Sequence, residues 1–160
     1  HKSCMGGDAY LPITQLLLTH GANTHVIDTH KSTPLHHAVD TNAIETVKLL
    51  LAAGADADAA DMLFGTPLQG ICARAYDVLH DESIAKKRVR IAQLLLKHGA
   101  NPNVKDDYQS SCFHGVIASP FMKADSIDSL KNSNKNLFFS QRKALIRALV
   151  LYGANLNAVD

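Results

Sequence analysis

Four apolar runs recur along the chain, and each is followed by two further residues and a glycine. The runs are Leu16-Leu17-Leu18, Leu49-Leu50-Leu51, Leu94-Leu95-Leu96 and Ala148-Leu149-Val150, and the glycines are Gly21, Gly54, Gly99 and Gly153. Glycine adopts at little cost the left-handed conformation that commonly ends a helix. The pattern therefore predicts four helices that each end at one of these glycines, with the apolar run as the last buried turn.

A second pattern marks where other helices begin. Thr33-Pro34-Leu35-His36 recurs as Thr66-Pro67-Leu68 and, in altered form, as Ser111-Cys112-Phe113-His114. Thr33 is suited to cap a helix, and Pro34 would occupy the first helical position, where a missing N–H costs nothing. The two patterns keep the same spacing: 33 residues for the first step, then 45, with 54 for the last glycine step. Insertions of 12 and 21 residues thus interrupt a regular period.

The period and the Thr-Pro-Leu-His signature resemble those of the ankyrin-repeat family. This resemblance implies an all-α solenoid of helix-turn-helix units with short β-hairpin fingers, in a single domain over residues 1–160. The units are 1–32, 33–65, 66–110 and 111–160, with insertions at about 76–87 and 119–139. In the first unit, residues 11–18 read as the second helix alone. Residues 1–10 are then either an atypical cap or part of an interrupted unit.

Both insertions fall in the turn between the two helices of a unit. In the third unit, helical character on both sides of His80-Asp81 predicts that both helices lengthen by about one and a half turns, with Asp81 as a cap. In the fourth unit, Pro120 is expected to stop the first helix and the segment KNSNKN to form a surface loop. Ser140 is then expected to cap the second helix.

The resemblance also implies a binding surface made of the finger tips and the exposed side of each first helix. The tips are residues 29–32, 62–65 and 107–110. The family usually has glycine two residues before the Thr, where this chain has Lys31, Phe64 and Gln109. Partner-binding residues are predicted to be His30, Lys31, His37, Asp40, Met62, Leu63, Phe64, Arg74, Asp107, Tyr108 and Gln109. The alternative is that Leu63 and Phe64 fold back to cover their own hairpin.

Composition narrows the functional class. The formal net charge is +1, which gives no electrostatic reason to expect nucleic acid. Three cysteines are too few and too scattered for a disulfide framework, and no run of about 18 apolar residues would span a membrane. We expect a monomeric module in the cytosol. Because the chain starts at His1 without a methionine, we also expect it to be part of a longer protein.

Three groups of residues raise chemical alternatives. Nine histidines do not show a metal-ligand spacing, and the Cys112-Phe113-His114 segment has no evident third group to orient a nucleophile and base. The basic run Lys86-Lys87-Arg88-Arg90 fits either an anion site or a solvated helix face. We predict no catalytic residue, no cofactor and no metal, so this chain is not expected to be an enzyme.

The sequence is therefore interpreted as a scaffold that binds another protein or peptide. The alternative is a substrate-recruiting region of a larger enzyme, a ligase or a secreted bacterial effector acting in a host cytosol, with the catalytic domain elsewhere. The family resemblance adds one modification: asparaginyl hydroxylation of Asn103 and Asn157, which lie eight residues after Leu95 and Leu149.

Overall fold

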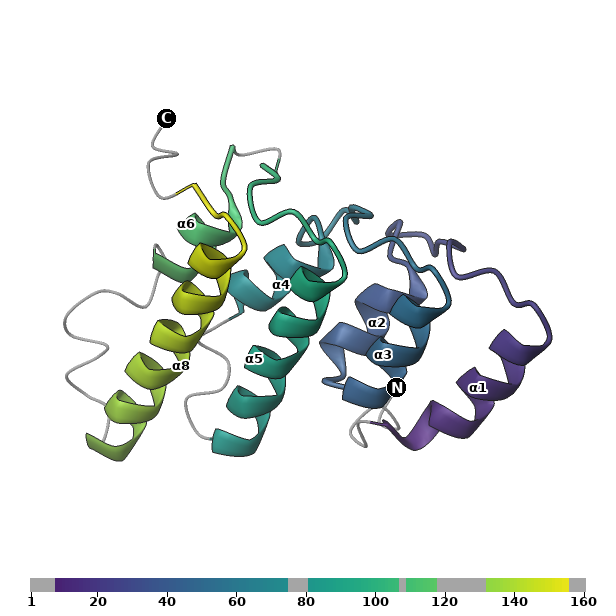
Figure 1. Ribbon diagram of the computed structural model, residues 1–160, viewed down its shortest axis with the longest axis horizontal. Helices are drawn as coiled ribbons and strands as arrows, with labels where there is room; N and C mark the ends of the chain where they lie inside the picture. The colour runs from purple at the N-terminus through teal and green to yellow at the C-terminus, as the bar shows by residue number, and fades with distance from the viewer. Residues whose placement is uncertain (1–7, 75–80, 107–108, 118–131, 156–160) are drawn as a thin grey trace.

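The computed structural model describes residues 8–74, 81–106, 109–117 and 132–155 (Figure 1). Its helices are α1 (Leu11–Thr19), α2 (Pro34–Asp40), α3 (Ile44–Ala52), α4 (Pro67–Ala73), α5 (Glu82–Lys97), α6 (Cys112–Ile117) and α8 (Asn132–Leu151). They form two layers, with α2, α4 and α6 inside and α1, α3, α5 and α8 outside. Each unit packs against its sequence neighbours, which is the architecture of a solenoid. The expected all-α solenoid is confirmed.

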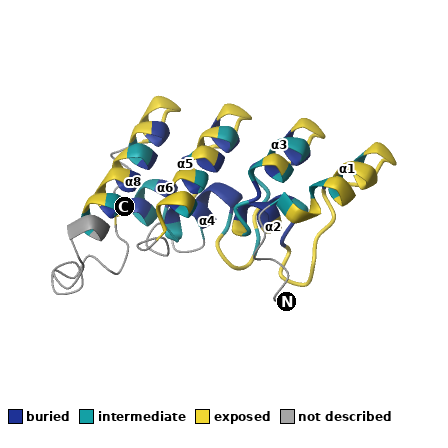
Figure 2. Ribbon diagram, turned by 90° about the horizontal axis from the view of Figure 1, so that it is seen from below, coloured by how far each residue is buried: buried dark blue, intermediate teal, exposed yellow. Residues whose placement is uncertain are grey.

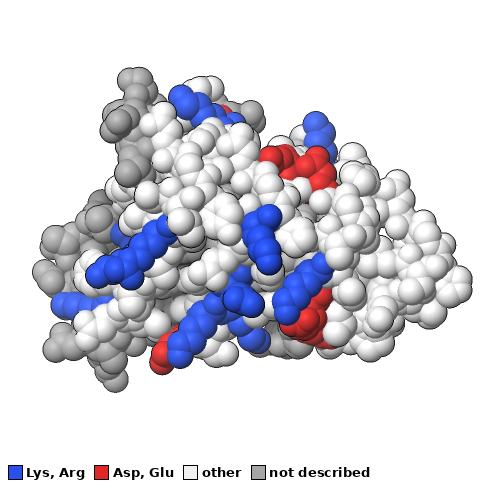
Figure 3. Space-filling view, viewed as in Figure 1, with Lys and Arg blue, Asp and Glu red and all other residues white. Residues whose placement is uncertain are grey.

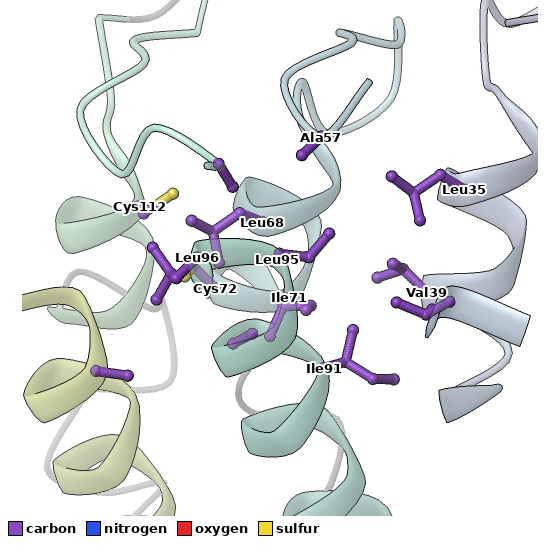
Figure 4. Close-up of a cluster of buried hydrophobic side chains, with 14 of the residues drawn as sticks. Leu35, Val39, Ala57, Leu68, Ile71, Cys72, Ile91, Leu95, Leu96 and Cys112 are labelled. Carbon is purple, nitrogen blue, oxygen red and sulfur yellow. The ribbon is translucent and has the colours of Figure 1, made fainter. Parts of the chain in front are cut away.

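The core lies between the two layers and runs continuously through the stack. Leu35, Leu68 and Val116 from the inner helices are fully buried, and so are Val47, Ile91, Leu95 and Leu149 from the outer ones. Figure 2 shows that the buried positions of the outer helices face the inner layer, while the far ends of these helices are exposed. In the close-up of Figure 4, Leu68 and Ile71 of α4 lie beside Leu95 and Ile91 of α5.

Local chemistry sets the ends of these helices. The backbone N–H of Thr66 donates to Gln69 Oε1 (2.8 Å), and the Thr66 hydroxyl accepts from the Gln69 N–H (3.3 Å). This reciprocal pair satisfies two backbone donors at the start of α4. At the other end of the outer helices, Gly54 has a φ of 84° and Gly99 of 92°, so each glycine turns the chain as predicted.

The first unit contributes α1 to the outer layer. Asp8 ties the start of this unit to α3, since its Oδ1 accepts from the Thr46 N–H (3.0 Å). Ile13, Leu16 and Leu17 of α1 are exposed, and no residue of this helix is fully buried. Residues 1–7 lie outside the described part of the chain, so the choice between a cap and an interrupted unit stays open.

The insertion in the third unit does not act as predicted. α4 has 7 residues, the same as α2, whereas α5 has 16 residues against the 9 of α3. Only the outer helix is longer, so the expectation that both helices lengthen is wrong. α4 ends at Ala73, and the carbonyl of the next residue, Arg74, accepts from the buried guanidinium of Arg88 in α5. Asp81 caps α5 as predicted, because its Oδ1 accepts from the N–H groups of Ser83 (2.8 Å) and Ile84 (3.1 Å).

The expected cap at Ser140 is also wrong. α8 begins at Asn132, and the Ser140 hydroxyl donates to the Leu137 carbonyl (2.9 Å) inside this helix. A polar stretch can be helical when one side of the helix faces solvent, because the backbone bonds are made within the helix itself. The polar segment KNSNKN, which favours a loop in the sequence, therefore lies in part within the first turns of α8. Residues 118–131, including Pro120, lie outside the described residues.

Candidate functional site

The fingers are short loops that an aspartate closes. The backbone N–H of Asp28 donates to the Ser32 carbonyl (3.1 Å), that of Asp61 to Gly65 (2.9 Å) and that of Asp106 to Ser110 (3.0 Å). An isolated antiparallel bridge joins Asp61 and Gly65. Among the described residues no regular strand forms, so the predicted β-hairpin fingers are better described as tight turns.

In two of the three tips, a residue other than glycine adopts the left-handed conformation, which is unfavourable for it. Lys31 has a φ of 61° and Gln109 of 59°, at the positions where the family usually has glycine. In the second finger the left-handed residue is instead Gly65, with a φ of 77°, one position later than in the other two fingers. Phe64 is thereby relieved of a conformation that costs a bulky residue about 1 kcal/mol or more. The second finger thus differs in register from its neighbours.

The carboxylate of Asp61 organises the second finger and joins it to the first. Its Oδ1 accepts from the N–H groups of Leu63 (2.9 Å), Phe64 (2.8 Å) and Gly65 (3.1 Å). Its Oδ2 accepts from the Ser32 hydroxyl (2.9 Å). Burial by itself raises the pKa of Asp61, but the hydrogen bonds that its charged form accepts outweigh burial and leave the pKa below its ordinary value.

Asp28 has the same function in the first finger. Its Oδ1 accepts from the N–H groups of His30 (2.8 Å) and Ser32 (3.0 Å), and its Oδ2 lies 2.9 Å from His37 Nε2. Partial desolvation raises the pKa of Asp28, and these hydrogen bonds lower it further than desolvation raises it. His37 is thus held against the first finger while its ring remains largely exposed.

Asp40, Phe64 and Arg74 come together across two units. The guanidinium carbon of Arg74 lies 4.1 Å from the centre of the Phe64 ring, and Arg74 also forms an ion pair of 2.8 Å with Asp40. A cation over an aromatic face is attracted by about 0.5–1 kcal/mol at exposed sites. Phe64 is also close to Gly70, since a Cβ on that glycine would lie 3.7 Å from Phe64 Cβ. One side of the Phe64 ring therefore folds back onto α4.

Met62 and Leu63 do not fold back. Met62 is 66% exposed and Leu63 is 53% exposed, against 39% for Phe64. The backbone of Met62 is nevertheless fixed, because its N–H donates to the His30 carbonyl (2.9 Å) of the first finger. Two apolar side chains are thus displayed on a braced loop, beside an aromatic ring that Arg74 covers on one face.

A hollow of about 150 Å³ separates the second and third fingers. Residues 60–65 line one wall, residues 104–106 line the other, and Gln69 lies among the lining residues. Gln69 is a residue that the sequence analysis missed. Its Nε2 donates to the carbonyls of Val104 (3.1 Å) and Ser110 (3.3 Å), so it fixes the position of the third finger. Gln69 is the fourth residue of the signature in its unit, the position that His36 occupies in the second unit. This position in the sequence is what indicates that Gln69 holds the next finger.

His36 does the same for the second finger. Its Nε2 lies 3.0 Å from the Gly65 carbonyl, and its Nδ1 is 3.1 Å from the Thr33 backbone nitrogen. Because a carbonyl can only accept, the Nε2 carries the proton and Nδ1 accepts from Thr33. The signature histidine is therefore a structural hydrogen bonder.

The predicted binding residues are distributed as follows. His30, Lys31, His37, Asp40, Met62, Leu63, Phe64 and Gln109 are exposed, and Arg74 is partly exposed. Asp107, Tyr108 and Asn157 lie outside the described residues. Asn103 is exposed but bonded, because its Oδ1 accepts from the Asn155 N–H (2.7 Å) and its Nδ2 donates to the Gly153 carbonyl (3.0 Å). Its amide joins the third unit to the fourth.

Cys112, the candidate nucleophile, lies beside a second buried cysteine, Cys72. Cys72 and Cys112 are both buried free thiols in the core. A hydrogen bond with Cys112 and burial raise the pKa of the Cys72 thiol well above its usual value. Such a thiol is poorly suited to act as a nucleophile, because the reactive form is the thiolate.

The described part of the chain has neither a cluster of metal ligands nor a membrane-spanning helix. Within it, no three histidine, cysteine or acidic side chains gather where they could hold a metal ion. No helix there combines the length and the apolar composition needed to cross a bilayer.

Comparison with known families and proteins gives consistent matches. Residues 1–61 match the family described as ankyrin repeats (3 copies), and residues 66–107 match the family described as ankyrin repeat. The chain is 40% identical over 85 residues to the B-cell lymphoma 3 protein homolog of Mus musculus, which covers 52% of this chain and 16% of that protein. It is 29% identical over 119 residues to the E3 ubiquitin-protein ligase KEG of Arabidopsis thaliana, covering 74% and 7%.

A third relative is the transient receptor potential channel pyrexia of Drosophila melanogaster, 27% identical over 144 residues, covering 89% of this chain and 14% of that protein. By name, these three are a lymphoma protein homolog, a ubiquitin ligase and a channel. What they share with this chain is a segment that makes up at most 16% of their length.

Proposed function

Because the chain belongs to the ankyrin-repeat family, whose repeats are generally protein-interaction modules, we propose that it binds a partner protein across its first to third fingers. The contact surface comprises the finger tips and the exposed sides of α2 and α4. Its centre is the group of Met62, Leu63 and Phe64, which we name the second-finger patch. The chain acts as a single copy and a rigid scaffold, with no catalytic step of its own.

The observation that carries this proposal is the exposure of the second-finger patch on a braced loop. Scattered apolar residues on a surface need no explanation, but neighbouring ones on a fixed loop favour a binding site. Met and aromatic residues are enriched at the cores of interfaces. The bonds from Met62 to His30 and from Asp61 to the loop N–H groups hold the patch before any partner arrives. Pre-organisation of this kind lowers the entropy cost of binding.

The polar groups around the patch favour a partner with a mixed surface. Arg74 is already paired with Asp40 and stacked on Phe64, so it adds an oriented cation at the edge of the patch. His30, Lys31 and His37 lie on the neighbouring finger and helix, and all three are exposed. We expect a partner segment whose apolar side chain enters between Met62 and Leu63 and whose acidic groups approach Lys31 and Arg74.

The experiment uses the whole chain as bait. A specific partner is first isolated from a cell lysate and identified by mass spectrometry, and its dissociation constant is then measured by calorimetry. The variant Met62→Ser with Leu63→Ser should weaken that partner by about 2 kcal/mol or more, since buried anchors often cost this much. Its urea midpoint should change little, because surface substitutions usually stay within about 0.5 kcal/mol.

A matched control places two substitutions on the outer layer. Glu45→Ala with Lys48→Ala removes an exposed ion pair of 2.7 Å on α3, a helix of the outer layer (Figure 1). This control should retain the partner. If the control and the patch variant bind the partner equally well, the binding surface does not include the second-finger patch and the proposal fails.

A second candidate function follows from one relative. The ligase that matches 74% of this chain does so with 7% of its own length. This supports the alternative that the repeats recruit a substrate for a catalytic domain elsewhere in a longer protein. The two functions differ in one measurement. If the partner that binds the second-finger patch is chemically modified in cells that express the full-length protein, and is not when Met62 and Leu63 are replaced, the recruiting function is correct.

A further inference from the structure

A groove on the outer layer lies between α5 and α8. It consists of two hollows, of about 460 and 340 Å³, which share Arg90, Gln93 and Ala144 among their lining residues. Leu94, Ala148 and Leu151 line the first hollow, and Ala85, Val89 and Leu137 line the second. We name the two together the outer groove. It belongs to the opposite layer from α2 and α4, which form part of the proposed binding surface.

Charge is strongly segregated onto the two helices that form this groove. α5 and α8 together contain nine Lys and Arg residues and one acidic residue, Glu82, whereas the rest of the chain has seven Lys and Arg and fourteen acidic residues. The two helices therefore carry a formal charge of +8, and the rest of the chain carries −7. The net charge of +1 hides this separation. Figure 3 shows basic side chains gathered over α5 and α8, while the end of the molecule that contains α1 has none on this face.

Only some of these Lys and Arg side chains are accounted for by contacts within the folded chain. Arg88 and Arg142 are buried, and Arg142 stacks over the Phe138 ring at 4.5 Å. Lys86 pairs with Glu82 at 2.8 Å on the same helix. Arg90, Lys97 and Arg147 are different, because they line the outer groove, are exposed, and pair with no carboxylate in the described part of the chain. Like charges on neighbouring helices repel each other. A bound anionic group would remove this cost.

We infer that the outer groove binds an acidic amphipathic helix of a partner protein. Such a helix would place apolar side chains on Val89, Leu94 and Leu151 and its carboxylates toward Arg90, Lys97 and Arg147. α5 is 16 residues long, about 24 Å at ~1.5 Å per residue, so three to four turns of a ligand helix fit along it. A helix in an apolar groove between two others is a recurring mode of recognition, in which anchors repeat at i, i+3, i+4 and i+7.

The apolar floor is what selects this ligand over other anions. A nucleic-acid backbone needs cations but gains nothing from Leu94 and Leu151. An anionic membrane would meet a hollow between two helices, which a flat surface cannot fill. This site is separate from the second-finger patch, so the result of its test does not affect the proposal for that patch.

The probe is a fluorescein-labelled synthetic peptide of about 14 residues, with Leu at positions i, i+3, i+4 and i+7 and Glu on both flanks, ~21 Å long as a helix. Its dissociation constant is measured by fluorescence anisotropy against the whole chain. A scrambled peptide of the same composition is the control for charge alone. The designed peptide should bind about tenfold more tightly than the scrambled one, and its affinity should fall as salt is added.

Two charge-reversal variants of equal net charge locate the site. Arg90→Glu with Arg147→Glu should weaken the peptide by about tenfold or more, whereas Lys31→Glu with Lys105→Glu, on the fingers, should change it less than about twofold. A peptide with Lys in place of Glu should regain affinity for the first variant. This reversal tests the groove even if one variant is less stable. Leu151→Ser removes a side chain that is 80% exposed, and should weaken the designed peptide without lowering the urea midpoint.

Each contrary outcome overturns the inference. Equal binding of the designed and scrambled peptides would mean that only charge is recognised. Equal binding by the two charge-reversal variants would place the site elsewhere. Tighter binding to phosphatidylserine vesicles or to a DNA oligonucleotide would assign the groove to a membrane or to nucleic acid. Sedimentation that shows a dimer abolished by Arg90→Glu with Arg147→Glu would assign it to a second copy of this chain.

Discussion

Replacing Gln69 with alanine should destabilise the domain more than any single hydrogen bond would indicate. Gln69 is buried, with 6% of its surface exposed. Its Oε1 accepts from the Thr66 N–H (2.8 Å), and its Nε2 donates to the carbonyls of Val104 (3.1 Å) and Ser110 (3.3 Å). The amide therefore connects the start of α4 to the finger that leads into the next unit. Alanine removes all three bonds together.

The cost can be estimated from the groups left behind. Thr66 is fully buried, so its N–H would lose its partner without access to water. An unsatisfied buried donor costs about 1–3 kcal/mol, and each lost bond to a finger carbonyl adds about 0.5–1.5 kcal/mol less whatever water recovers. We expect Gln69→Ala to lower the free energy of unfolding by about 2–4 kcal/mol. For a domain of this size, each kcal/mol corresponds to about 2–4 °C in Tm.

The chain supplies its own control for this prediction. In the second unit His36 occupies the equivalent position and makes the equivalent bonds to Thr33 and Gly65. Gln69→His should therefore cost less than about 1 kcal/mol, as a substitution of similar volume usually does. The assay is urea denaturation followed by far-ultraviolet circular dichroism, with the slope checked for a change in cooperativity. Equal free energies of unfolding for the alanine and histidine variants would show that the side-chain amide does not brace the third finger.

Three further predictions test other parts of the molecule. Leu50→Ala opens a cavity at a site that is 3% exposed and should lower the free energy of unfolding by about 2–5 kcal/mol in urea melts, whereas an unchanged midpoint would contradict the assigned packing of α3. The lowered pKa of Asp61 stabilises the fold at pH values above the ordinary value of 3.8, and this stabilisation is lost as the pH falls through the lower folded value; the stability difference between the parent and Asp61→Asn should therefore shrink in acid, and a constant difference would count against it. Asn103 should gain one oxygen on incubation with an asparaginyl hydroxylase, faster in a Leu149→Ala variant that loosens the fourth unit, and mass spectrometry that finds no gain in either protein would reject this modification site.

The parts of the fold that the sequence predicts well depend on neighbours in the chain. A helix that begins at Thr66-Pro67, or one that ends at Gly99, is fixed by bonds within a few residues, and these boundaries agree with the structure. The length of α5 depends instead on what its added turns contact. Arg88 lies in those turns and bonds Asn42 Oδ1 (3.3 Å), 46 residues away. Periodicity alone gives no sign of that contact, so a prediction from the sequence divides the insertion wrongly between the two helices.

The candidate site shows the same division. The positions of Met62 and Leu63 on a finger tip follow from counting between Asp61 and Thr66. The stack of Arg74 on Phe64 does not, because it depends on Gly65 taking the left-handed conformation one residue later than Lys31 and Gln109 do. Phe64 is thereby turned toward α4. A shift of one residue in a loop thus decides which face of the Phe64 ring packs against the fold and which face stays available to a partner.

The two insertions have a common structural effect, which connects them to the outer groove. α5 exceeds α3 by seven residues and α8 exceeds it by eleven, and both gain their extra turns at the end farthest from the closing glycine. Leu137 and Gln141 of α8 then line a hollow with Ala85 and Lys86 of α5, and all four residues belong to the added turns. The second unit has no insertion, and α3, which begins at Ile44, has no turns equivalent to these. The added turns therefore supply most of the residues that line the second hollow, and Val89, Arg90, Gln93 and Ala144 supply the rest. The hollow forms because two neighbouring units were lengthened in the same layer.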